Sequence, residues 1–74
     1  MKIPADVKCV EFLYDLFVVK TLPGKAPWPA GALSTKLYTA GTKMFINDKR
    51  YDYYLMHYNP VNDEAYADFV KFYK

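Results

Sequence analysis

The most informative stretch of the sequence is the aromatic run Tyr51-Asp-Tyr-Tyr-Leu-Met-His-Tyr58. Successive side chains of a β-strand point to opposite faces. We therefore expect the odd-numbered positions of residues 51–57 to face a core and the even-numbered positions to face water. Because both rows contain aromatic side chains, one row can be buried while the other stays exposed. An exposed aromatic row indicates a surface that binds a partner.

This run is expected to be the second strand of a β-hairpin that covers residues 42–58. The Asn-Asp pair at 47–48 tolerates the left-handed conformation that a tight turn needs. A two-residue turn at this pair places Lys43 opposite Asp52, a favourable pair of opposite charges. The sequence therefore predicts a hairpin with a defined register.

The two faces of the predicted hairpin differ in character. The face expected in the core carries Met44, Ile46, Tyr51, Tyr53 and Leu55. The other face mixes charged with aromatic and apolar side chains, which is typical of a binding surface. Its candidate partner-binding residues are Lys43, Phe45, Arg50, Tyr54, Met56 and Tyr58.

Residues 4–19 are expected to form an N-terminal helix. Pro4 suits the first turn of a helix, and charged residues recur at helical spacing over residues 8–15. An apolar stripe lies opposite these charges and contains Val7, Val10, Leu13, Tyr14 and Phe17. The alternative is a strand through Leu16-Phe-Val-Val19, because β-branched and aromatic residues favour strands. The sequence leaves residues 15–22 open between helix and strand.

A loop rich in proline and glycine is expected over residues 22–33. Trp28 lies between two prolines in this loop. It either covers one end of the core or acts as a rigid contact for a partner, and we include it among the candidate partner-binding residues. A short strand over residues 36–39 and a turn at Gly41 follow the loop.

The end of the chain has the pattern of an amphipathic helix that begins at Asn62, a favourable N-cap. Its apolar residues follow helical spacing and are Tyr66, Phe69, Val70 and Tyr73. Together, the elements predict one α+β domain over residues 1–74. It would consist of an N-terminal helix, a Pro/Gly loop, a two- to three-stranded antiparallel sheet with a hairpin, and a C-terminal amphipathic helix.

The charge of the chain is concentrated in its middle. The formal net charge is +2, but residues 20–50 carry six Lys and Arg residues against Asp48 alone. This segment suits phosphate or an acidic protein. The favoured alternative is ordinary solubilising lysine, which also protects sheet edges from pairing.

Little in the sequence points to catalysis or to a cofactor. Cys9 is the only cysteine and His57 the only histidine. The expected apolar surroundings make Cys9 an inert thiol, and one Cys with one His is too little for a zinc site. We therefore expect no enzyme, no cofactor and no metal. The single cysteine favours a reducing compartment, and the charges within residues 3–22 argue against a membrane span.

These observations favour a small, non-catalytic protein-binding module. We expect a regulator or inhibitor of a larger protein assembly in the cytoplasm, with the profile of a viral or mobile-element accessory protein. The alternative is a single-stranded nucleic-acid-binding protein that uses an aromatic and basic sheet face. A homodimer that buries the same face is a third hypothesis. The sequence does not identify the partner or the source.

Overall fold

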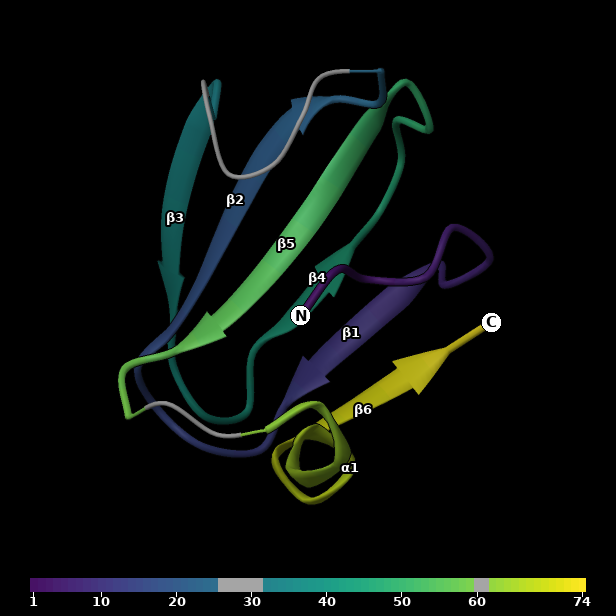
Figure 1. The fold of residues 1–74 in the computed structure, drawn as a ribbon. Coiled ribbons are helices and arrows are strands. Elements are labelled where there is room, and N and C mark those ends of the chain that lie inside the picture. Colours follow the sequence, from purple (N-terminus) through teal and green to yellow (C-terminus); the bar gives the residue numbers. More distant parts are fainter. Residues whose placement is uncertain (26–31, 60–61) are drawn as a thin grey trace.

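The computed structural model of the chain describes residues 1–25, 32–59 and 62–74. It corrects the predicted α+β class. Over the described residues the chain is mostly β-structure, with two three-stranded antiparallel sheets and one short helix (Figure 1). Among these residues, no helix is long and apolar enough to cross a membrane.

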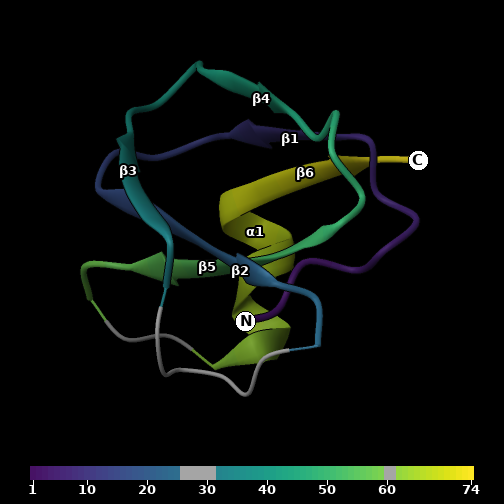
Figure 2. The same ribbon diagram turned by 90° about the horizontal axis from the view of Figure 1, so that it is seen from above.

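Two central strands organise the two sheets. The first sheet has the order β4-β1-β6, with bounds Lys43–Phe45, Cys9–Phe12 and Val70–Tyr73. The second has the order β3-β2-β5, with bounds Ser34–Tyr38, Phe17–Pro23 and Tyr51–His57. Viewed from above, β4, β1 and β6 lie in one layer and β2 and β5 in another, while β3 runs from the second layer toward the first (Figure 2).

The start of the chain extends the second sheet. Lys2 pairs with Tyr54 in an isolated antiparallel bridge. The amide of Ile3 donates to the carbonyl of Tyr53 at 2.8 Å, and the amide of Leu55 donates to the carbonyl of Met1 at 2.7 Å. The free edge of β5 is therefore occupied by residues 1–3.

The core lies between the two sheets and takes inward-facing side chains from β1, β2, β4, β5 and β6, while the half-buried Tyr38 of β3 packs against it. Its fully buried members include Val10, Phe12, Phe17 and Leu55. The ring of Phe12 stacks on Tyr38 at 4.7 Å and lies 5.5 Å from Phe17. Aromatic contacts of this kind join β1, β2 and β3, because large rings fill a small core with few residues.

The predicted N-terminal helix is wrong. Its residues form β1 and β2, separated by a turn over residues 13–16 in which Leu16 has a φ of 70°. Leu13 and Tyr14, assigned to the buried stripe, are 45% and 52% exposed. Short apolar runs look alike in a buried strand and a buried helix, and the strand alternative through Leu16–Val19 is the correct one.

The predicted hairpin is also wrong, although the side-chain alternation on which it depends is observed in the second half of β5, whereas residues 51–54 are all half-buried. β4 pairs with β1 and β5 pairs with β2, so the two strands belong to different sheets. Lys43 lies opposite Glu11 rather than Asp52. The expected inner and outer rows are seen at Leu55, which is fully buried, and at Met56, which is 40% exposed. Side-chain alternation depends only on the strand itself and on a core at one of its faces. Strand pairing depends on which sheet edges elsewhere in the chain are available.

The predicted C-terminal helix stops after little more than one turn. Asn62 does cap it, because its side chain accepts from the amide of Ala65 at 2.9 Å. A 3-10 turn, η1, covers Asp63–Ala65 and α1 covers Tyr66–Phe69, after which β6 begins. The last residues become a strand because β1 has a second open edge, with which β6 forms four residue pairs.

Two smaller predictions are confirmed. The short strand expected over residues 36–39 corresponds to β3, and Gly41 lies in a turn with a φ of 85°. The predicted loop begins later than expected, since β2 includes Leu22 and Pro23.

Candidate functional site

The structure divides the predicted partner-binding surface between two sheets. Tyr54, Met56 and Tyr58 follow the outer row of β5, in the second sheet. Lys43 and Phe45 are on β4, in the first sheet, and thus on another outer face. Arg50 belongs to neither outer face. Arg50 precedes β5 and forms an ion pair of 2.8 Å with Asp48, and Trp28 lies outside the described residues.

The outer face of the β3-β2-β5 sheet carries a contiguous group of apolar side chains. Val18 is the direct cross-strand neighbour of both Leu37 and Met56. The amide of Tyr58 donates to the carbonyl of Leu16 at 3.1 Å, which adds one more rung to the same two strands. We call Leu16, Val18, Leu37, Met56 and Tyr58 the Val18 face.

The Val18 face is exposed to an unusual degree for residues of this type. Relative exposure is 44% at Leu16, 56% at Leu37, 40% at Met56 and 75% at Tyr58. Single exposed apolar residues are normal on a protein surface, whereas neighbouring ones mark an interaction site. Strand register places Leu37 and Met56 on either side of Val18. The backbone bond between Tyr58 and Leu16 extends the β2-β5 ladder by one pair, so these exposed residues are grouped rather than single.

Leu16 has an unfavourable backbone conformation within this group. Its φ of 70° lies in the left-handed region, which costs a residue with a Cβ about 1 kcal/mol or more. The core gains little from this conformation because the side chain of Leu16 is half exposed. Backbone strain of this kind is frequent at functional sites, which supports a role for the Val18 face.

The electrostatics of the Val18 face are mildly basic. Lys20 lies on the same outer row of β2 and is the cross-strand neighbour of Thr35 and Tyr54. The carboxylate of Asp52 forms an ion pair of 3.2 Å with Lys2. Lys36 of β3 faces the other side of the sheet, and neither β2 nor β3 contains an acidic residue.

The outer face of the β4-β1-β6 sheet has a different chemistry. Phe45 and Tyr73 lie on either side of Cys9 and, together with Lys43, line a shallow hollow of about 240 Å³. The hydroxyl of Tyr73 donates to a carboxylate oxygen of Glu11 at 2.9 Å. The hollow is smaller than a usual small-molecule site, which measures roughly 300–1,000 Å³.

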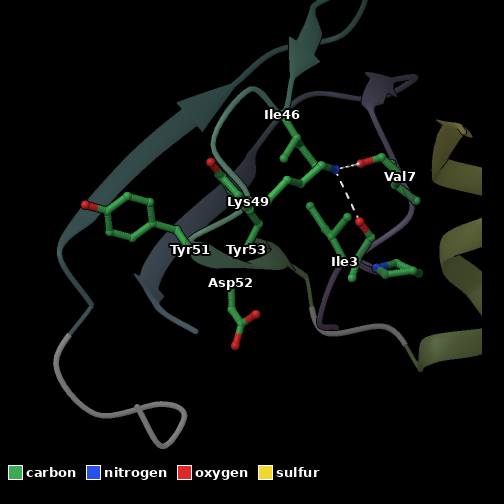
Figure 3. Close-up of a pocket in the computed structure, with 9 residues that line it drawn as sticks. Ile3, Val7, Ile46, Lys49, Tyr51, Asp52 and Tyr53 are labelled. Atoms are coloured by element: carbon green, nitrogen blue, oxygen red, sulfur yellow. Dashed lines mark hydrogen bonds between the residues drawn. The ribbon is translucent and has the colours of Figure 1, made fainter. Parts of the chain in front are cut away.

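A second hollow, of about 250 Å³, lies between the N-terminal segment and the chain that leads into β5. Lys49 extends across it and donates to the carbonyls of Ala5 at 3.2 Å and Val7 at 2.9 Å (Figure 3). Tyr51 projects away from Lys49 in this view. Both acceptors of the Lys49 ammonium group are backbone carbonyls, so its role here is to join two segments of the chain.

The residues considered for catalysis do not come together. Cys9 is on the outer face of the first sheet, whereas His57 ends β5 in the second. The ring of His57 packs against Phe17 at 4.6 Å and Phe69 at 5.4 Å, as expected for a structural histidine. Within residues 1–25, 32–59 and 62–74, no cluster of His, Cys, Asp and Glu could hold a metal ion.

Shifted pKa values lie away from the Val18 face. A side-chain hydrogen bond from Arg50 lowers the pKa of Asp48 to about 2. Burial, and secondarily the charge of Tyr53, raises the pKa of Tyr38 above its ordinary value. The shift at Asp48 comes from its bond with Arg50, and the shift at Tyr38 comes mainly from its burial, so both have a cause within the fold.

Sequence reasoning found Met56, Tyr58 and the adjacent Tyr54 but missed Leu16, Val18 and Leu37. The signal for Leu16 and Val18 was present in the strand alternative for residues 16–19. Leu37 had no comparable signal, because exposed leucines are common and only strand register brings it next to Val18. Comparison of the chain with protein-family models, with curated proteins and with solved structures yields no match.

Proposed function

We propose that the protein is a non-catalytic protein-binding module and that the Val18 face contacts its partner. The observation that carries this proposal is the grouping of four exposed large side chains around Val18 on one sheet. Tyr58 is 75% exposed, so a partner that covers this face would bury much of its side chain. Leucine, methionine and tyrosine side chains at the centre of an interface exclude water and provide its apolar core.

The same proposal includes a regulatory role. The two hollows described above are below the usual size of a ligand site, which favours a protein that acts by occupying a surface of a larger protein. We propose a regulator or inhibitor of a larger assembly. The cytoplasm is the proposed compartment, on the ground that the chain has a single, buried cysteine.

The nucleic-acid alternative was based on a single aromatic and basic sheet face, which is not present as predicted. The predicted face combined Tyr54 and Tyr58 with Lys43, Phe45 and Arg50, and these residues do not share a face. An aromatic and basic group remains on the first sheet, but the carboxylate of Glu11 lies within it and repels phosphate. Protein binding therefore has the stronger support.

A paired capture experiment tests the proposal. Met56→Glu places a charge in the middle of the Val18 face, and Phe45→Glu makes the same type of change on the other sheet as a matched control. The wild type and Phe45→Glu should retain the same partner from a lysate of the source cell, whereas Met56→Glu should lose it. If Met56→Glu stays folded by circular dichroism and retains that partner, the Val18 face is not the binding site.

A further inference from the structure

We propose that the partner binds as an added β-strand along β3, through an extended segment whose residues alternate between apolar and acidic. This inference rests on the proposed protein-binding function and specifies its mode. In such complexes, main-chain hydrogen bonds provide affinity, and alternate side chains provide specificity.

The first observation is that β3 is a free sheet edge next to the Val18 face. In the described part of the chain, β3 pairs with β2 alone (Figure 1). Residues Ser34–Lys36 of β3 are all exposed, as is Leu37. The opposite edge of the same sheet is occupied by residues 1–3, so β3 is the edge that a new strand can extend.

The second observation is the direction of the backbone groups. The bond from the amide of Tyr58 to the carbonyl of Leu16 shows that even-numbered residues of β2 direct their backbone groups toward β5. Odd-numbered residues of β2 therefore face β3, since these groups alternate along a strand. The odd-numbered residues of β2 pair with the even-numbered residues of β3. The even-numbered residues of β3 therefore direct their backbone groups toward β2. Thr35 and Leu37 consequently direct their N–H and C=O groups away from the sheet, where an incoming strand can use them.

The third observation is the chemistry on either side of this edge. The side chain of Leu37 belongs to the Val18 face, so the partner residue beside it should be apolar. Lys36 projects to the opposite face, where its ammonium lies 5.2 Å from the ring centroid of Tyr38. Neither β2 nor β3 contains an acidic residue, so an acidic partner residue beside Lys36 would meet no competing carboxylate on these two strands. The partner segment should therefore carry an acidic residue beside Lys36, with apolar residues on either side of it in the sequence.

Lys36 also argues against a second copy of the chain as the occupant. A copy that paired with β3 symmetrically about Lys36 would place two ammonium groups directly opposite each other, and like charges in this position are destabilising. Lysine on an edge strand is a common protection against such self-association. The same residue favours an acidic segment.

The experiment uses the full chain, labelled with ¹⁵N, and two blocked peptides of about nine residues. One peptide alternates Val and Glu, and the matched control alternates Val and Lys. The Val-Glu peptide should shift the Thr35 and Leu37 amide signals and slow their hydrogen exchange, with at least about threefold tighter binding than the control. No effect on these two amides, or equal affinity for both peptides, overturns the proposal.

Three variants of β3 provide a second test with the same peptides. Thr35→Pro removes an outward N–H without breaking the β2 ladder, whereas Thr35→Val keeps that N–H and serves as the control. Thr35→Pro should lose the Val-Glu peptide while Thr35→Val binds it. If Thr35→Pro does not fold, Lys36→Glu is the deciding variant. It should bind the Val-Lys peptide more tightly than the Val-Glu peptide, the reverse of the wild type. An unchanged preference in Lys36→Glu overturns the proposal.

Other occupants give different results, and each would overturn the inference. Slowed exchange at Thr35 that grows with protein concentration alone indicates a second copy. Binding of oligothymidylate that moves Lys20 and Lys36 signals without protecting the edge amides indicates a phosphate contact. If Met56→Glu loses its cellular partner but Thr35→Pro retains it, the proposed function stands and strand addition fails. If both retain it, the proposed function fails as well.

Discussion

The replacement Phe12→Ala provides the sharpest test of the two-sheet core, with Phe45→Ala as its matched control. Both residues are phenylalanines on paired strands, but Phe12 is fully buried and Phe45 is 64% exposed. The ring of Phe12 stacks on Tyr38 at 4.7 Å and contacts Phe17 at 5.5 Å. Its removal should therefore leave a cavity between the two sheets.

The expected loss follows from these contacts. Replacing a buried phenylalanine by alanine costs about 3–5 kcal/mol, whereas a domain of this length has a total stability of about 4–11 kcal/mol. Phe12→Ala should thus remove a large part of the free energy of unfolding. Phe45→Ala should cost about 1 kcal/mol or less, because roughly a third of its side chain is buried.

Urea unfolding followed by circular dichroism measures both losses. With a slope of about 1 kcal/mol per molar urea, the midpoint should fall by about 3 M or more for Phe12→Ala and by about 1 M or less for Phe45→Ala. Equal shifts, or a larger one for Phe45→Ala, would show that the inner and outer rows of β1 and β4 are assigned incorrectly.

Three further replacements test the termini and turns. Asn62→Ala removes the cap of the 3-10 turn and should cost about 1 kcal/mol in urea unfolding, while Asn62→Asp should restore most of it. Lys49→Met removes the two hydrogen bonds to the carbonyls of Ala5 and Val7. It should lower the free energy of unfolding in urea by about 1–3 kcal/mol, with Lys49→Arg as the control. Asp48→Asn should lower the melting temperature at pH 7. Arg50 holds the pKa of Asp48 in the folded state at about 2, below an unfolded value of roughly 4. The difference in melting temperature between the wild type and Asp48→Asn should therefore disappear as the pH falls from 4 to 2.

The sequence was sufficient to predict side-chain alternation but not strand partners. Met44 and Leu55 were expected in the core from their positions within single strands, and both are buried. This prediction holds because alternation is a local property of an extended chain. The partner of a strand is decided elsewhere: β4 pairs with β1, more than thirty residues earlier in the chain.

The N-terminal helix and the C-terminal helix were mispredicted for a related reason. In β1, Cys9, Val10 and Phe12 are all buried, and a run of this kind lacks the alternation that identifies a strand. At the end of the chain, Asn62 and Tyr66 behave as a helix start predicts, but β6 replaces the rest of the helix. Tertiary pairing outweighed local spacing in both segments, because β1 pairs with β4 and β6, β2 pairs with β3 and β5, and β6 pairs with β1.

These errors also explain why the candidate site was only partly found. Pairing β4 with β5 had joined Phe45 and Tyr54 into one surface, and the real pairing separates them. In exchange, β2 and β3 bring Val18 and Leu37 next to Met56, a group that no local pattern contains. A surface assembled across three strands is specified by register, and register is the property that a single sequence conveys least. The replacements at Met56 and Thr35 are therefore more informative than those at Phe45, because their expected effects follow only from the observed pairing.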